Sequence, residues 1–147
     1  MKPNMLSGSF SLDSGVLIEI LASTSSGQHI VQGLLSDSIT AYTSYLNLSE
    51  AEYILCRKLG AELSRTKVDN LLRSNYITVV DMERLHVLAA QIKCERALAL
   101  ADCYSLATAK ITNSRALFAF KEEELAREIQ RKPFETQISF LEDVTPD

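Results

Sequence analysis

Short stretches typical of β-strands alternate with longer stretches typical of amphipathic helices along the whole chain. This alternation constrains the fold most, because strands joined by helical crossovers build a parallel sheet with helices on both faces. The pattern predicts a three-layer α/β/α domain with a central, mostly parallel sheet. At 147 residues the chain suits a single domain over residues 1–147, since two domains of half this size would each have a marginal core. We expect the core to span Gly8–Leu141, followed by a loose tail.

Five extended stretches are expected to form the sheet, and the segments between them are expected to form helices. The predicted strands are Gly8–Leu12, Ala41–Leu48, Ile77–Val80, Arg115–Phe120 and Gln137–Leu141. A break at Gly27 is expected to divide the first helical segment into two short helices. After the second strand, Ser49 is a suitable cap for a helix that begins at Glu50 and ends at Gly60.

Composition narrows the class of protein. Cys56, Cys94 and Cys103 form no C-x-x-C pair and lie in apolar, helix-like contexts, which suits reduced thiols better than disulfides or a zinc site. The apolar runs are short and Met1–Leu12 is interrupted by polar residues, so we expect no membrane span, no signal peptide and a soluble, cytoplasmic protein. A net charge of −4 argues against a broad basic surface. Contact with nucleic acid would therefore be local or assisted by a metal.

Four acidic residues fall where predicted strands lead into helices. Asp13 follows the first strand, Glu50 the second and Glu122 the fourth, while Asp102 lies in the first turn after an apolar run. Because the carboxyl ends of parallel strands share one edge of a sheet, these carboxylates are predicted to meet. Helix capping explains Asp13 and Asp102 about as well, since aspartate is a preferred capping residue.

A cluster of these carboxylates would require compensation. At an effective dielectric near 20, two like charges about 4 Å apart cost roughly 4 kcal/mol, whereas a helix N-terminus offsets only about 0.3 to 1 kcal/mol. A divalent cation would reverse this balance. Oxygen ligands select Mg²⁺ or Mn²⁺ over zinc, for which the sequence has no clustered cysteine or histidine.

Four segments of the sequence share a pattern with one known family. They are L-D-S-G-V-L (Leu12–Leu17), N-L-S-E-A-E-Y-I-L (Asn47–Leu55) with R-K-L-G after it (Arg57–Gly60), A-L-A-D-C-Y-S-L-A-T-A-K (Ala99–Lys110) and A-L-F-A-F-K-E-E-E-L (Ala116–Leu125). The D-[ST] opening and the A-D-x-x-x-x-A-x-A segment are the most specific of these. In this order they resemble PIN domains of the prokaryotic VapC-type toxin group, and the resemblance covers nearly the whole chain.

The resemblance implies a role for each acid. Asp13, Glu50 and Asp102 would be catalytic residues and metal ligands, and the Ser14 hydroxyl would support Asp13. Glu122 would be the fourth acid of the same site.

Two of these positions have competitors. The family more often has an aspartate after T-x, whereas here Phe120-Lys121 precede three glutamates, so Glu123 or Glu124 would be alternatives to Glu122. Glu52 competes with Glu50, but at i+2 it points to a different side of the helix. The N-L-S-E segment favours Glu50.

The resemblance further implies a metal-dependent ribonuclease that cuts single-stranded RNA with a metal-activated water. Members of this family dimerise, and in toxin–antitoxin pairs a small antitoxin protein inserts a chain segment near the acidic pocket. A homodimer and such a partner are therefore expected here. Val68, Leu71 and Leu72 share one helical face, which suits a dimer surface or core packing equally well.

Several basic residues lie near the predicted acids in the sequence. Arg57, Lys58, Lys93 and Arg96 are candidates for phosphate contacts, or ordinary surface charges. His29 and His86 have no carboxylate or cysteine partner at a useful spacing and are interpreted as structural or surface residues.

Two other classes remain as alternatives. A receiver-type phosphoacceptor domain is also doubly wound and would use Asp81 after the third strand, but it requires an acidic pair where this chain has Asp13-Ser14-Gly15. A catalytically inactive PIN-like scaffold that binds RNA or protein is the second. The sequence contains neither a P-loop nor a G-x-S-x-G motif.

Overall fold

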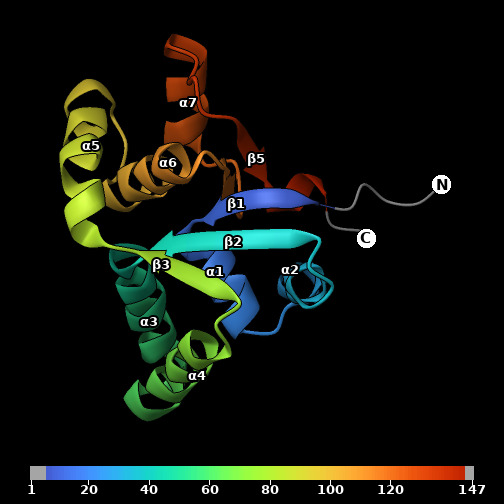
Figure 1. Cartoon of the computed structure of the whole chain (residues 1–147). Coiled ribbons are helices and arrows are strands. Elements are labelled where there is room, and N and C mark those ends of the chain that lie inside the picture. The colour runs from blue at the N-terminus through green and yellow to red at the C-terminus, as the bar shows by residue number, and fades with distance from the viewer. Residues whose placement is uncertain (1–5, 145–147) are drawn as a thin grey trace.

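A five-stranded parallel sheet forms the centre of the computed structural model, which describes residues 6–144 (Figure 1). The strand order is β3-β2-β1-β4-β5, and all four pairings are parallel. The strands are β1 (Gly8–Leu12), β2 (Ile39–Ser44), β3 (Ile77–Val80), β4 (Arg115–Phe118) and β5 (Ile138–Phe140). The predicted three-layer α/β/α architecture is confirmed.

Helices cover both faces of the sheet. In Figure 1, α1 to α4 lie below the strands and α5 to α7 lie above them. The helices are α1 (Ser14–Leu21), α2 (Ser25–Leu35), α3 (Tyr45–Leu59), α4 (Ala61–Ser74), α5 (Met82–Glu95), α6 (Leu100–Thr112) and α7 (Glu123–Arg131). A short 3₁₀ helix, Leu141–Asp143, follows β5. Residues 145–147 of the predicted loose tail lie outside the described residues, as do residues 1–5 of the segment in which no signal peptide is expected.

Successive side chains of a strand point to opposite faces of the sheet, and this creates two apolar layers. Phe10, Leu12 and Leu117 pack with α1 to α4, whereas Ala116 and Phe118 belong to the cluster under α5 to α7. Full burial of one such large side chain contributes about 1.5–3 kcal/mol. A shift of one residue would exchange the two faces, so burial on both sides fixes the register of the central strands.

The order of the strands places a crevice between β1 and β4. The chain passes from β1 to β2 and β3 on one side, and then returns to place β4 and β5 on the other. Ligands of open α/β sheets bind at the carboxyl ends of the strands where this reversal occurs. The order also differs from the 2-1-3-4-5 order of receiver-type folds. The receiver alternative is therefore excluded, and its candidate Asp81 is an exposed residue after the edge strand β3.

The second and fourth strands end at Ser44 and Phe118, earlier than the expected Leu48 and Phe120. Two predicted helix starts are also wrong. The helix expected to begin at Glu50 begins at Tyr45, because the Ser44 hydroxyl accepts the Asn47 N–H at 3.1 Å and caps it. The break expected at Gly27 lies earlier, since Thr24 caps α2 and Gly27 is in its first turn. Glycine is required there because an added Cβ would lie 2.0 Å from the Glu19 carbonyl oxygen of α1.

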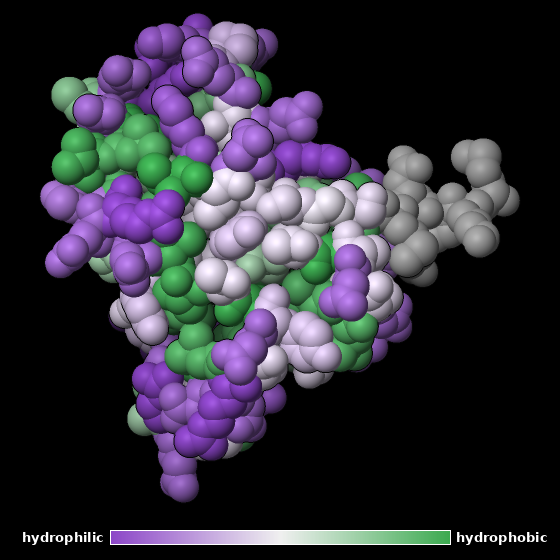
Figure 2. Space-filling model, viewed as in Figure 1, coloured by the Kyte–Doolittle hydropathy of each residue, from purple (hydrophilic) through white to green (hydrophobic). Residues whose placement is uncertain are grey.

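The surface is mostly polar in the view of Figure 2, with polar side chains over α4 and α7 and an apolar patch over part of α5. Val68 is buried, and Leu71 and Leu72 pack partly buried against the core, so this helical face belongs to the core.

Within residues 6–144 the three cysteines are free thiols. No helix in this part of the chain combines the length and the apolar character needed to cross a membrane.

Candidate active site

A cavity of about 460 Å³ lies where the carboxyl ends of β1 and β4 meet α3, α6 and the start of α7. All four acids predicted from the sequence line it, namely Asp13, Glu50, Asp102 and Glu122. Apolar side chains form much of the remaining wall, among them Ile18, Ile54 and Leu125. The fold therefore brings together acids that belong to four different helices or their N-caps, α1, α3, α6 and α7.

Each acid reaches the cavity from a different local structure. Asp13 is the N-cap of α1, and its Oδ2 accepts the Gly15 N–H at 3.4 Å. Asp102 lies in the first turn of α6 but makes no capping hydrogen bond. Glu50 lies inside α3 rather than in the first turn expected for it. Glu122 is exposed at the N-cap position of α7.

Burial raises the pKa of the two aspartates. The pKa of Asp13 rises to about 6, mainly through desolvation and slightly through the charge of Glu50, against hydrogen bonds from Ser105 and the Ser14 and Gly15 N–H groups. The pKa of Asp102 rises to about 7, first through desolvation and then through the charges of Asp13, Glu122, Glu50 and Glu124. Without a cation, the cavity thus holds at least part of a proton near neutral pH.

A buried hydrogen-bond network around Asn47 orients Asp13. Asn47 Nδ2 donates to the Ser14 hydroxyl at 3.1 Å, the Ala101 carbonyl at 3.1 Å and the Ser105 hydroxyl at 2.9 Å. Its Oδ1 accepts the Ser44 hydroxyl at 2.5 Å. Ser105 in turn donates to Asp13 Oδ1 at 2.8 Å. Asn47 therefore connects α1, α3 and α6 behind the acids.

Asn47 and Ser105 were not among the predicted site residues. The sequence pattern placed Asn47 at the end of a strand, so its burial inside a helix was not expected. Ser105 had a detectable signal, because it lies three residues after Asp102 and the two share a helix face. The resemblance assigned support of Asp13 to the Ser14 hydroxyl, but the structure places that hydroxyl against Asn47 and gives the contact to Ser105.

Asn47→Ala should destabilise the fold by about 2 to 3 kcal/mol, since it leaves buried partners on three elements without their hydrogen bonds. Urea unfolding followed by circular dichroism measures this. The matched control is Asn70→Ala, at an exposed position on α4, which should change the free energy of unfolding by less than about 0.5 kcal/mol. Equal effects of the two substitutions would contradict the proposed importance of the network.

The competing glutamates occupy other surroundings. Glu52 pairs with Arg65 at 3.0 Å in a groove between α3 and α4, outside the acidic cavity. Glu123 is highly exposed and pairs with Arg127 at 2.8 Å. Glu124 is exposed, although its charge contributes to the raised pKa of Asp102. The cavity thus includes Glu50 and Glu122 and not Glu52 or Glu123.

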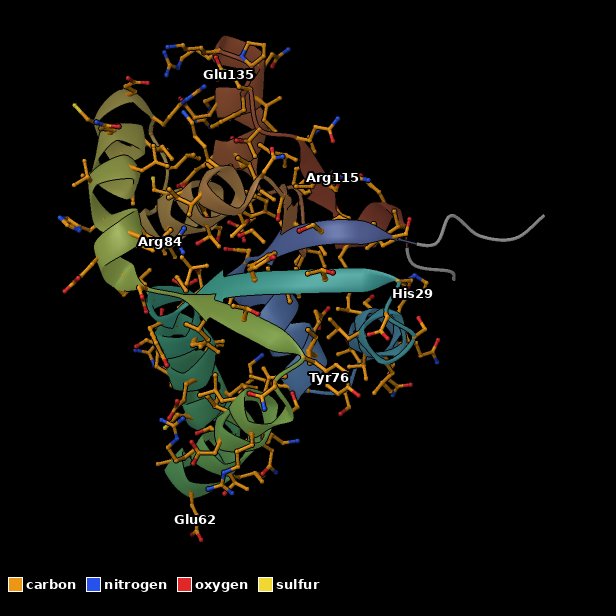
Figure 3. The ribbon with its side chains drawn as sticks, viewed as in Figure 1. His29, Glu62, Tyr76, Arg84, Arg115 and Glu135 are labelled. Atoms are coloured by element: carbon orange, nitrogen blue, oxygen red, sulfur yellow. The ribbon has the colours of Figure 1, made fainter. Side chains whose placement is uncertain are left out.

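Among the candidate phosphate contacts, only Lys58 lines the cavity. Arg57 lies over the ring of Tyr53, at 4.9 Å from its centroid. Lys93 Nζ donates to the Leu98 carbonyl at 2.6 Å. His29 lies at the opposite end of the sheet from the acids (Figure 3), and His86 is exposed on α5.

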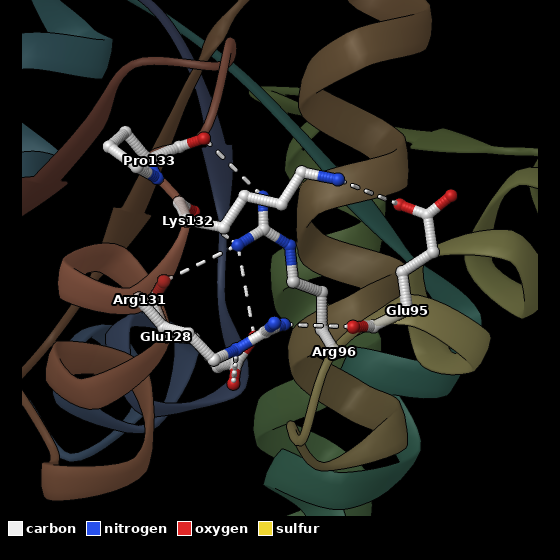
Figure 4. Close-up of polar contacts among 6 residues, drawn as sticks. All are labelled: Glu95, Arg96, Glu128, Arg131, Lys132 and Pro133. Atoms are coloured by element: carbon white, nitrogen blue, oxygen red, sulfur yellow. Dashed lines mark hydrogen bonds and ion pairs between the residues drawn. The ribbon is translucent and has the colours of Figure 1, made fainter.

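Arg96 belongs to an ion-pair cluster that anchors α7 (Figure 4). Its guanidinium lies 3.8 Å from Glu128 Oε1, stacks on Phe134 and donates to the carbonyls of Lys132 and Pro133. Arg131 makes two hydrogen bonds to the Glu128 carboxylate, at 2.8 and 2.9 Å. These bonds from Arg131, opposed by desolvation, lower the pKa of Glu128. The cluster joins the end of α5 to the end of α7.

Asp102→Asn should stabilise the metal-free protein at pH 8 by about 1 to 3 kcal/mol. A raised pKa means that the folded protein keeps a proton that the unfolded chain has lost. The stability that protonated Asp102 contributes is therefore fully present below about pH 4 and is lost as the pH rises to about 7, where Asp102 ionises in the folded protein. Urea unfolding in EDTA at pH 5 and pH 8 measures the difference, with exposed Asp81→Asn as the control. A variant no more stable than the unaltered protein at pH 8 would contradict this origin of the shift.

The sequence matches the family model of the PIN domain over residues 11–132. The chain therefore belongs to the PIN-domain family, which confirms the resemblance drawn from its four segments. It matches no curated protein sequence.

Three solved structures are similar over most of the chain. VapBC2 from Rickettsia felis, bound to a DNA fragment from its promoter, has 15% identity and a TM-score of 0.62, with 90% of this chain and 98% of that chain covered. VapC20 from Mycobacterium tuberculosis, described as a sarcin-ricin loop cleaving toxin, has 18% identity and a TM-score of 0.60, with 80% and 94% covered. A toxin–antitoxin complex from Klebsiella pneumoniae has 13% identity and a TM-score of 0.60, with 89% and 96% covered. At these identities the likeness shows the fold.

Proposed function

We propose that this protein is a metal-dependent endoribonuclease that cuts single-stranded RNA and acts as the toxin of a toxin–antitoxin pair. The observation that carries the proposal is the convergence of Asp13, Glu50, Asp102 and Glu122 on one cavity at the strand-order reversal. Membership of the PIN-domain family supports it. The description of the similar VapC20 as a sarcin-ricin loop cleaving toxin adds support for a cleaving toxin.

The donor set suits a hard cation that is held partly through water. Among residues 6–144, no group of three or more histidine, cysteine, aspartate or glutamate side chains is close enough to hold one ion directly. Mg²⁺ keeps several waters and commonly uses one or two carboxylates together with substrate phosphates. Asp13 and Asp102 would hold Mg²⁺ or Mn²⁺, with Glu50 and Glu122 contributing through water. The bound ion would activate the attacking water and offset charge on the phosphate.

The chain's own residues would orient the substrate and the acids. Ser105 fixes one oxygen of Asp13 and the Gly15 N–H fixes the other. Lys58, on the wall that α3 contributes, would contact a backbone phosphate of the RNA. Apolar side chains in the wall lower the local dielectric, which strengthens charge interactions near them.

RNA cleavage with purified protein tests the function. Mg²⁺ or Mn²⁺ should support cleavage of labelled single-stranded RNA and EDTA should stop it, while Asp13→Asn and Asp102→Asn should each lower the rate by about 100-fold or more. Asp81→Asn, after the edge strand, should leave the rate unchanged. Full activity in either site variant would contradict the assignment of that acid. RNA binding without cleavage in every metal would support the inactive scaffold instead.

We also infer a homodimer and a small inhibitory protein partner. The protein partner is supported by the likeness to a structure described as a toxin–antitoxin complex, and the homodimer by what membership of the PIN-domain family implies. Light scattering of the purified protein should give twice the monomer mass of 16.3 kDa. Co-expression with a small protein whose reading frame lies immediately upstream of the gene should suppress RNA cleavage. A monomer, or undiminished cleavage in the co-purified complex, would contradict the corresponding inference.

A further inference from the structure

Phe120 is the one phenylalanine of the chain that is left exposed. Phe10, Phe118 and Phe140 are buried, and Phe134 is partly buried beneath Arg96. Phe120 instead exposes 54% of its surface and lines the same cavity as the acids. Single exposed apolar residues are common on proteins. Phe120 differs from such scattered residues because it lies on the wall of a cavity that carboxylates also line.

Hydrogen bonds hold the backbone around Phe120 in place. The Phe120 carbonyl accepts the Glu122 N–H at 3.0 Å, and the Ala119 carbonyl accepts the Glu142 N–H at 3.1 Å. The Lys121 N–H donates to the Glu142 carboxylate at 3.0 Å. The buried side chains of Phe118 and Ala119 anchor the preceding residues. The aromatic ring is therefore presented from a fixed backbone, which lowers the entropy lost when a flat ligand stacks on it.

Lys58 lines the same cavity as the exposed ring. Lys121 is the neighbour of Phe120 in sequence, but it does not line the cavity, and its Nζ lies 5.7 Å from the centre of the Phe140 ring. Neither lysine takes part in an ion pair within residues 6–144. An exposed aromatic ring and a cation without an ion pair in the same cavity suit single-stranded nucleic acid, because a base stacks on the ring and a phosphate pairs with the charge.

We propose that Phe120 is a stacking platform for one unpaired nucleobase, next to the phosphate that enters the acidic cavity. The proposal rests on the ribonuclease function and extends it by naming the subsite that selects unpaired RNA. A base-paired nucleotide has both faces covered by its neighbours in the helix, so only an unpaired base is free to lie on the ring. An apolar segment of a protein partner is the competing occupant of this face.

The absence of tryptophan from the chain makes a direct optical test available. In the Phe120→Trp variant, a stacked base should quench most of the indole fluorescence when a short single-stranded RNA is added, with Ca²⁺ replacing Mg²⁺ so that the strand is bound and not cut. A ribose-phosphate oligomer of equal length without bases should not quench it. Tyr76→Trp is the matched control, because Tyr76 is also exposed but lies at the opposite end of the sheet (Figure 3).

Binding measurements complete the test. Phe120→Leu keeps the apolar character but removes the aromatic face, and should raise the Kd for single-stranded RNA about tenfold while leaving that for the base-free oligomer unchanged. Fluorescence anisotropy of the labelled oligomers measures both. Circular dichroism and urea unfolding establish that the variants are folded.

Several results would overturn the platform. RNA that binds Phe120→Trp by anisotropy without quenching its fluorescence would contradict the platform. Equal quenching by the base-free oligomer or by duplex RNA would contradict it as well. An unchanged Kd in Phe120→Leu, in a protein that still cuts RNA, would contradict the platform and leave the ribonuclease function intact. Failure of the unaltered protein to bind RNA at all would contradict the ribonuclease function, and the platform with it.

Discussion

The parallel pairing of β1 with β4 joins the beginning of the chain to its last third, and the site is built on this contact. The Asp13 N–H donates to the Leu117 carbonyl at 3.0 Å, which continues the strand pairing to the residue that bears the first acid. Helices α1 and α6 begin close to this junction, and β4 leads directly to Phe120 and Glu122. If this pairing were absent, the four acids would belong to unrelated parts of the chain.

The second constraint is the cost of placing carboxylates together in a poorly solvated cavity. The raised pKa values of Asp13 and Asp102 express this cost, because burial and mutual repulsion both disfavour the charged forms. Polar groups behind the acids offset part of it. Ser105 and two backbone N–H groups stabilise the charged form of Asp13, and Asn47 keeps Ser105 in position. The proposed cation site and a destabilised region of the metal-free fold are thus the same structure.

The sequence allowed the fold class, the approximate strands and the candidate acids to be predicted, because these depend on local patterns. Apolar stretches identify strands, and an acid directly after a strand has a defined place in a parallel sheet. The start of α3 was wrong by five residues (50 − 45) because the cap at Ser44 overrides the strand preference of the following tyrosine. Asn47 and the role of Arg96 depend on partners far away in the sequence, so no local pattern revealed them.

The cluster of Arg96, Glu128 and Arg131 fixes the position of Glu122 by holding the far end of α7 in place. The helix is anchored near its last turn, whereas Glu122, the N-cap residue directly before its first turn, lines the cavity. Each residue of an α-helix turns the chain by about 100° and advances it by about 1.5 Å. The number of residues between anchor and acid therefore sets both the direction and the height of Glu122. An insertion or deletion in this stretch would turn the acid out of the cavity, although every residue of the site remained present.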